Sequence, residues 1–241
     1  MPKNIEFFCF HKCASMFIFR YMEAICQNSE FVLYSPNNQP PNDMEYNSAS
    51  GHKIHAPIRE TPKDFKSDTL YLIHLRDPLD ILISQYYSYG YTHIEPNDEN
   101  LLKLFQQRRN EIQNQTIEEY CSNDKVIAEL KSKFAKVRDW QEKHVNEKNI
   151  INSFYDDMFY NFKYWNNQIT NHLKLDNDLS VFLYNKFHES FMVRPIDNKE
   201  ILNGRAKPHK RNGRSGQYKT ELSDKLVKRL QEHFADIWTY D

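Results

Sequence analysis

The sequence predicts an α/β fold, in which helices flank a central parallel β-sheet of about four to five strands. Short apolar runs alternate along the chain with segments in which apolar residues recur every three or four positions, as they do in amphipathic helices. The run from Leu70 to Leu75 is almost wholly apolar, which is typical of a strand buried on both faces of a parallel sheet. Ligands of such sheets collect beyond the carboxyl ends of the strands, so the loops there are the expected place for a site.

The first strand and helix of the chain enclose a short loop that suits an anion. Ile5 to Phe10 is an apolar run and Ser15 to Cys26 has helical periodicity, so Lys12 lies in the turn between them. The first backbone N–H groups of a helix have no partner within it, and the dipole end there is positive. A phosphate group fits this arrangement, with Ser15 as a cap or a ligand. The alternative is an ordinary strand–helix turn with a surface lysine.

The remaining elements follow from similar patterns. Three further runs are predicted strands, at residues 30–34, 53–56 and 149–155. Asp77-Pro78 is a typical helix start, with an acidic cap and a proline in the first turn, and Gly90 is the predicted end of that helix. The other predicted helices are residues 101–120, 126–145, 162–173, 179–187 and 224–234. Residues 35–50 and 194–219 are polar and are predicted loops.

Composition narrows the class of protein. At 241 residues the chain is long enough for a stable core, and we expect residues 1–241 to form a single domain. The formal net charge is -1, so any basic site must be local. No apolar run long enough for a membrane span and no signal-peptide pattern is seen. The four cysteines have neither CxxC nor metal-ligand spacing, so we expect reduced thiols, a cytoplasmic protein and no metal.

Two other stretches suit anions. Arg76 directly follows the buried strand, and Ser84 lies two turns into the next helix. From Ile201 to Thr220 the chain has six Lys or Arg residues, no Asp or Glu, and three of its five glycines. Glycines let backbone amides approach an anion closely while basic side chains neutralise it. The alternatives for this loop are a solvated stretch or a nonspecific nucleic-acid patch.

Together these stretches resemble the sulfotransferases that use 3′-phosphoadenosine-5′-phosphosulfate (PAPS), of the cytosolic type and its bacterial relatives. The family's strand–loop–helix motif, Pro-Lys-Ser-Gly-Thr-Thr-Trp, is similar to His11-Lys-Cys-Ala-Ser-Met-Phe17. Its Arg with a Ser eight residues later is similar to Arg76 and Ser84, and its Arg-Lys-Gly-x-x-Gly-Asp-Trp-Lys to Arg211-Asn-Gly-Arg-Ser-Gly-Gln-Tyr-Lys219. Two smaller matches are Lys53-Ile-His-Ala-Pro57 and Phe154-Tyr-Asp-Asp-Met158. The matches follow the family's order over residues 8–219, nearly the whole chain.

The resemblance implies an activity and the groups that perform it. The enzyme would move a sulfuryl group from PAPS to a hydroxyl, or an amine, of a small-molecule or carbohydrate acceptor, and would release adenosine 3′,5′-bisphosphate (PAP). Lys12 would contact the leaving 5′-phosphate and the bridging oxygen. His55 would be the general base, and Lys53 would lie beside the sulfuryl group. The 5′-phosphate would be held by the Ser15 hydroxyl and by the backbone amides of Cys13, Ala14, Ser15 and Met16.

The resemblance also implies how the rest of the donor is bound. Arg76 and Ser84 would bind the 3′-phosphate together with the C-terminal loop. Phe17 and Tyr155 would bracket the adenine by stacking and edge contacts. In the C-terminal loop the matching residues are Arg211, Asn212 and Gly213.

The chain departs from the family motif inside the phosphate loop. Ala14 stands where the motif has its glycine, and Met16 where it has the second threonine, which removes one hydroxyl. Backbone amides could still serve the phosphate. No acid–base partner stands at a suitable spacing from Cys13, so we interpret it as a backbone donor position rather than a nucleophile.

Two other functions stay open on the sequence alone. A P-loop kinase or NTPase needs a Gly-x-x-x-x-Gly-Lys-Ser/Thr loop and a magnesium-holding acidic residue, yet no glycine precedes Gly51. A non-enzymatic nucleotide or nucleic-acid binding module could use the basic C-terminal loop, but it would leave the Lys53-x-His55 element unexplained. On the sulfotransferase interpretation we expect no nucleic-acid partner and no metal requirement.

Overall fold

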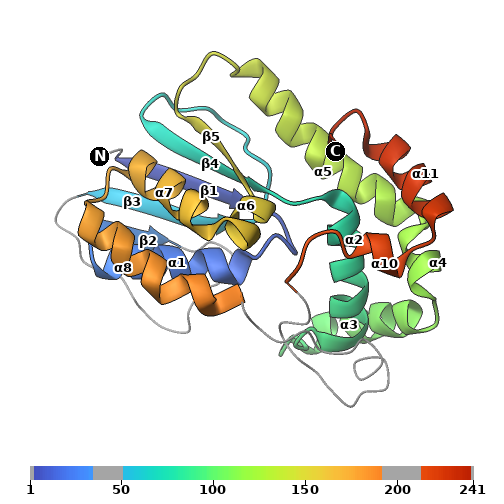
Figure 1. Cartoon of the computed structure of the whole chain (residues 1–241). Coiled ribbons are helices and arrows are strands. Elements are labelled where there is room, and N and C mark those ends of the chain that lie inside the picture. The colour runs from blue at the N-terminus through green and yellow to red at the C-terminus, as the bar shows by residue number, and fades with distance from the viewer. Residues whose placement is uncertain (1–2, 35–50, 192–212, 240–241) are drawn as a thin grey trace. The chain divides into compact units, whose positions relative to one another are not determined.

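The structure, a computed structural model, describes residues 3–34, 51–191 and 213–239 (Figure 1). Within these residues five strands form one sheet, with every pairing parallel, in the order β2-β3-β1-β4-β5. Helices flank the sheet, so the predicted α/β fold is confirmed. The chain divides into two compact units, residues 1–76 with 136–191 and residues 77–135 with 192–241, which are described in turn.

The first unit contains the whole sheet. β1 lies between β3 and β4; the chain leaves β1 toward β2 on one side and leaves β4 toward β5 on the other. The carboxyl ends of β1 and β4 therefore meet where the order of strands reverses, which is where such sheets bind ligands. The strands are β1 (Asn4–Cys9), β2 (Phe31–Tyr34), β3 (His52–Ile58), β4 (Thr69–Leu75) and β5 (Ile150–Phe154).

Helices cover one face of the sheet (Figure 1), and aromatic side chains pack beneath them. Tyr21 and Trp165 are fully buried with ring centroids 4.9 Å apart, and the Tyr21 hydroxyl donates to Asn166 Oδ1 at 2.7 Å. Burial of side chains this large contributes roughly 1.5–3 kcal/mol each. The layer thus fixes the first helix, and the loop before it, to the sheet. The helices are α1 (Ser15–Gln27), α6 (Tyr155–Tyr160), α7 (Phe162–Leu173) and α8 (Asn177–Phe187), with a 3-10 turn, η2 (His188–Phe191), after α8.

The opposite face of the sheet packs against the last turns of α5 (Asp124–Lys143). The Trp140 ring lies 5.0 Å from the ring of Tyr71 on β4, and Phe65 stacks on Tyr71 at 5.6 Å. His74, three residues further along β4, points to the other face because side chains alternate along a strand, and its ring lies 6.2 Å from Trp165. Both faces of β4 are thus covered, which explains its apolar sequence.

The second unit is helical in its described part, and α2 is its centre. Asp77 caps this helix by accepting the N–H of Leu79 at 2.8 Å, and Pro78 occupies the first turn, as the sequence indicates. α4, α10 and α11 all contact α2. The elements are α2 (Pro78–Tyr87), a π-helical turn η1 (Ser88–Thr92), α3 (Glu99–Gln113), α4 (Ile117–Cys121), the first turns of α5, α10 (Tyr218–Glu221) and α11 (Asp224–Phe234).

The prediction of one helix over residues 101–120 is wrong, because the helix is interrupted between the end of α3 and the start of α4. Thr116 starts the second helix with a capping box. Its hydroxyl accepts the N–H of Glu119 at 3.2 Å, and the Glu119 carboxylate accepts the N–H of Thr116 at 2.7 Å. These two bonds satisfy N–H groups that a continuous helix would have paired differently. The Thr-x-x-Glu pattern is the sequence signal for this second start.

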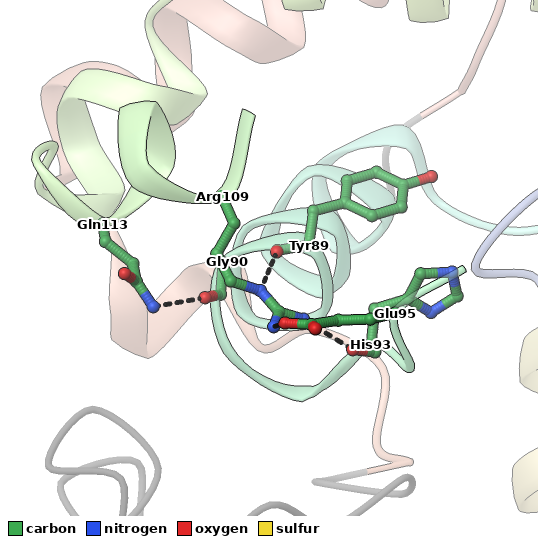
Figure 2. A network of polar contacts seen from close by, with 6 residues as sticks. All are labelled: Tyr89, Gly90, His93, Glu95, Arg109 and Gln113. Carbon is green, nitrogen blue, oxygen red and sulfur yellow. Dashed lines mark hydrogen bonds and ion pairs between the residues drawn. The ribbon is translucent and has the colours of Figure 1, made fainter. Parts of the chain in front are cut away.

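Gly90 does not end α2 as predicted; it lies inside the π-helical turn. A Cβ atom at position 90 would lie 2.9 Å from Cγ2 of Ile112, so the close approach of α3 requires the glycine. Figure 2 shows the polar contacts that fix this turn to α3. The Gln113 side chain donates to the Gly90 carbonyl oxygen at 2.7 Å, and Arg109 pairs with Glu95 at 2.7 Å.

Of the two predicted loops, one is partly described and the other is not. The stretch 194–219 is described from residue 213 onward, and its end is helical because α10 begins at Tyr218. The stretch 35–50 lies outside the described residues. Of the helices in the described ranges, none combines the length and the apolar character that a membrane crossing would require.

Candidate active site

The loop between β1 and α1 is a tight turn closed by backbone hydrogen bonds. The N–H of Cys13 donates to the Phe10 carbonyl oxygen at 3.1 Å, so this predicted phosphate donor is engaged inside the turn. The N–H groups of Phe17 and Ile18 donate to the Ala14 carbonyl oxygen at 2.9 and 3.0 Å, which makes Ala14 the N-cap of α1. The start of a helix, where the positive end of its dipole lies, is a typical place for an anion to bind.

Two residues of this loop have left-handed backbone conformations. The φ angles are 72° at Lys12 and 64° at Ala14. A residue with a Cβ atom loses roughly 1–2 kcal/mol in this region, whereas glycine enters it freely. The motif that the sequence resembles has glycine at the position of Ala14, and the backbone shows the reason. The loop therefore adopts a left-handed turn without a glycine, at a local cost in stability.

Cationic side chains gather around this loop. Arg76, which follows β4, donates from Nη1 to the Lys12 carbonyl oxygen at 2.9 Å. Arg59, which follows β3, donates from Nη2 to the Ser15 hydroxyl oxygen at 3.5 Å. Its Nη1 lies 3.3 Å from Nε2 of His11. Residues after three different strands thus converge on the start of α1.

This gathering of positive charge changes the acidity of Lys12. Burial, then Arg59, then Arg76 lower the pKa of its ammonium group from 10.5 to about 8. An anion bound in the loop would favour the charged ammonium and raise this pKa again. The loop is therefore electrostatically prepared for a negatively charged ligand.

Arg59 belongs to this cationic cluster, although its place in the sequence did not single it out. It stands two positions beyond the Lys53-to-Pro57 segment, just after the end of β3. Arg76 was singled out because it is a basic residue just past a buried strand, and the same criterion would have found Arg59. Arg59 was not singled out because the strand before it, β3, is short and half polar in sequence.

Arg76 and Tyr155 form a stacked pair at the ends of β4 and β5. Arg76 is only 4% exposed, and its guanidinium carbon lies 4.1 Å from the centroid of the Tyr155 ring. A guanidinium over an aromatic face is attracted to the ring and held in a defined plane. The structure thus brings together Lys12, Arg76 and Tyr155, which the sequence assigned to one donor molecule.

A buried polar network lies next to this pair. The Trp165 Nε1–H donates to the Ser153 hydroxyl oxygen at 2.6 Å, and Nδ1 of His74 lies 2.8 Å from the same oxygen. Burial, followed by the charge of Arg76, lowers the pKa of His74 to about 3, so the imidazole is neutral. Its ring centroid is 6.4 Å from that of Tyr155. The network ties β4, β5 and α7 together where Arg76 and Tyr155 emerge.

Phe17 is a core residue in this structure. Its ring lies 6.0 Å from Phe162, 6.0 Å from Trp165 and 5.5 Å from Phe187. It is buried between α1, α7 and α8, so the helices surround most of the ring. Its place beside an adenine stays a prediction.

His55 lies inside β3, three residues before the end of the strand and in register with Glu6 of β1. The His55 ring stacks on the ring of Tyr34 of β2, with 5.1 Å between the centroids. The Lys53 ammonium lies 5.7 Å from the centroid of the Tyr34 ring. Burial, then the charges of Lys53 and Lys66, lower the pKa of His55 below its usual 6.5. The imidazole is therefore neutral at neutral pH and can accept a proton. Its described contacts group it with Tyr34, Lys53 and Lys66.

The second unit holds the other predicted donor residues. Ser84 is half-buried on α2. Gly213 is the first described residue of the C-terminal loop, while Arg211 and Asn212 lie outside the described residues. The grouping of these residues around a phosphate stays a prediction.

The Cys13 thiol is poorly suited to nucleophilic attack. Burial is the largest cause that raises the pKa of the Cys13 thiol, to about 12, so the thiol is neutral and a poor nucleophile. Among the described residues, no three His, Cys, Asp or Glu side chains are grouped so that they could hold a metal ion.

Comparisons with known proteins give the chain its relatives. A family model described as "Sulfotransferase domain" matches residues 6–238. The mouse sulfotransferase SULT7A1 complexed with PAP is similar in structure, with a TM-score of 0.59 and 17% identity over 98% of this chain and 84% of that chain. Retinol dehydratase in a complex with retinol and PAP is similar with a TM-score of 0.51 and 14% identity over 100% and 84%. No curated protein matches the sequence. At these identities the likenesses in structure establish the fold.

Replacing Ala14 by glycine should stabilise the protein. Glycine removes the Cβ penalty of the left-handed conformation but adds freedom to the unfolded chain, so we expect a net gain of about 0.5–1 kcal/mol in the free energy of unfolding. Urea titration of A14G against the unmodified chain measures it. As a matched control, Ala24→Gly in the middle of α1 should lose about 1 kcal/mol. An A14G variant less stable than the parent would show that the loop is not strained at this position.

Proposed function

The chain belongs to the sulfotransferase domain family and is a PAPS-dependent sulfotransferase, and we propose that its acceptor is a hydroxyl, or an amine, of a small molecule or carbohydrate. The observation that carries the donor side of this proposal is the cluster of Lys12, Arg59 and Arg76 around the start of α1. Cations converging on a helix N-terminus at the end of a parallel sheet suit a phosphorylated ligand.

In the proposed reaction the acceptor oxygen or nitrogen attacks sulfur in line with the bond to the 5′-phosphate. That S–O bond breaks, PAP leaves, and the acceptor loses its proton to a base. Negative charge grows on the bridging oxygen, so fixed positive groups there lower the barrier most, by analogy with phosphoryl transfer. Lys12 is assigned this position. With a pKa of about 8 it is mostly charged at pH 7 and can donate to the leaving oxygen.

Arg59 is proposed to share the 5′-phosphate end with Lys12. Its guanidinium lies 3.5 Å from the hydroxyl oxygen of Ser15, which the sequence assigns to the 5′-phosphate. A planar guanidinium presents two parallel donors to a phosphate, and it stays charged where the lysine does not. Arg59 would therefore keep the end of β3 positive at every physiological pH.

His55 is proposed as the base that takes the acceptor's proton. Its lowered pKa leaves the imidazole neutral, as a base must be before the reaction. The stacked Tyr34 ring orients it, and Lys53 stands two residues away on the same strand. The match of Lys53-Ile-His-Ala-Pro57 to the family motif supports this assignment.

The nucleoside and the 3′-phosphate complete the donor. In the first unit Tyr155 is assigned to the adenine and Arg76 to a phosphate, because the two are held together at the ends of β5 and β4. In the second unit Ser84 and the backbone N–H of Gly213 are assigned to the 3′-phosphate. Two similar proteins, SULT7A1 and retinol dehydratase, form complexes with PAP, which supports a donor with two phosphate groups.

Calorimetry with nucleotides tests the proposed donor. Without magnesium, PAP should bind at least roughly tenfold more tightly than ATP, because only PAP can fill both phosphate positions. Transfer of labelled sulfate from PAPS into a panel of alcohols, phenols, sugars and amines then identifies the acceptor class. Equal affinity for the two nucleotides, or ATP binding that needs magnesium, would instead indicate a kinase or NTPase.

The affinity for PAP should depend on pH through Lys12. The free ammonium has a lowered pKa of about 8, and a bound phosphate raises it, so affinity is greatest below pH 8 and falls as the pH rises above it. Between pH 7.5 and 9.5 the fall should be roughly ten- to thirtyfold, measured by titration at constant ionic strength.

The matched variant for this test is Lys12→Arg, whose guanidinium stays charged throughout the range. Its affinity for PAP should be nearly independent of pH between these values. An equal pH dependence in the parent and in K12R would show that some other group titrates.

His55→Ala should lower turnover and spare the donor. General bases contribute roughly 100- to 10,000-fold, so kcat should fall by that order while the Kd for PAP stays within about threefold. His52→Ala is the control, because His52 lies on the same strand and packs against Phe31. If H55A also lost PAP binding, His55 would have a structural role, and an unchanged kcat would point to another base.

A further inference from the structure

A buried carboxylate holds the C-terminal loop to α2. Asp80, in the first turn of α2, is 0% exposed. One of its oxygens accepts the backbone N–H of Gly216 at 2.7 Å, and the other accepts the N–H of Gln217 at 2.9 Å. A carboxylate excluded from water is costly unless hydrogen bonds replace its solvation, so this pair of amides is strongly bound.

The loop is shaped around this contact. Gly216 has a φ of 76°, the left-handed conformation that turns the chain so that successive N–H groups face one carboxylate. The buried side chain of Gln217 donates back to the carbonyl oxygen of Arg214 at 2.6 Å. Residues 214–217 thus form a closed turn with Asp80 as its external partner.

A second contact ties the same segment to α2 further along the helix. The Tyr87 hydroxyl donates to Oε2 of Glu221 at 2.8 Å. Asp80, Ser84 and Tyr87 stand at positions i, i+4 and i+7 of α2, so they share one face of the helix. Figure 1 shows α10, which ends at Glu221, beside α2. The chain from Gly216 to Glu221 therefore follows the helix face on which Ser84 lies.

We propose that Asp80 is a positioning residue that sets the selectivity of this site for a 3′-phosphate. It does not touch the donor. By binding two loop amides it holds the residues that follow Gly213 on the Ser84 face of α2, so that the Gly213 backbone and the Ser84 hydroxyl are presented together. This inference rests on the proposed function, in which these two groups bind the 3′-phosphate.

A carboxylate without hydrogen-bond partners would repel a nearby phosphate. Both oxygens of Asp80 accept backbone N–H groups, which offset part of its negative charge. The repulsion between the two charges remains, and the two donated N–H groups offset part of it. The negative residue thus serves an anion site by ordering it.

The test compares PAP with adenosine 5′-monophosphate, which has the same 5′ end but no 3′-phosphate. In Asp80→Asn the side chain keeps its size but presents an N–H₂ group to one of the two amides. PAP binding should weaken by about 10- to 100-fold in calorimetry, while binding of the monophosphate changes by no more than about twofold. Tyr87→Phe removes the second contact without disturbing the turn at Gly216, and it should leave the ratio of the two affinities unchanged.

A second variant keeps the test decisive if D80N does not fold. Gly216→Ala adds a methyl group that meets only the Lys219 side chain, at 3.8 Å, but strains the turn through its φ. It should produce the same loss for PAP alone, by about fivefold or more. Equal losses for both nucleotides in D80N and G216A, or an unchanged ratio, would overturn the role of Asp80. If the unmodified protein itself does not prefer PAP, the proposed donor fails, and the inference fails with it.

Discussion

The hydrogen bond from the buried guanidinium of Arg76 to the carbonyl oxygen of Lys12 is the contact on which the proposed donor site of the first unit depends. It joins the segments that leave β4 and β1, the two neighbouring strands at which the sheet order reverses. The ring of Tyr155 fixes the same guanidinium from the end of β5. A single side chain thus sets the relative positions of three strand ends, and the start of α1 follows from them.

This arrangement has two energetic costs, one electrostatic and one in the backbone. Like charges are normally kept apart, yet Arg59 and Arg76 both lower the pKa of Lys12. The backbone at Lys12 and Ala14 is held in a region that residues with a side chain avoid. Electrostatic and backbone strain of this kind persist where the surrounding packing enforces them, and they concentrate at functional sites. Here the aromatic layer around Tyr21 and Trp165 provides the enforcement. A bound anion would relieve the electrostatic part.

In the second unit a negatively charged side chain orders the backbone of a loop. A loop rich in glycine and basic residues has many backbone conformations, and its amides would face an anion only by chance. Asp80 selects one conformation by binding two consecutive amides from inside the helix. Both units therefore rely on backbone N–H groups held in place by buried charged side chains. In the first unit the side chain is a cation bonded to a carbonyl oxygen, and in the second it is an anion bonded to N–H groups.

The sequence by itself determined the class of fold, the order of the five strands along the chain, and the placement of Lys12 and Arg76 after two of them, because hydrophobic periodicity and strand ends are local properties. Only the tertiary structure decided which residues meet. It showed that Arg59 contacts the Lys12 loop and that Phe17 is packed among three helices. It also showed that Gly90 is required by the close approach of Ile112 and does not end a helix. It also paired Asp80 with amides 136 and 137 positions away. Such contacts depend on the crossing of elements distant in sequence, and no periodicity or spacing within one segment encodes them.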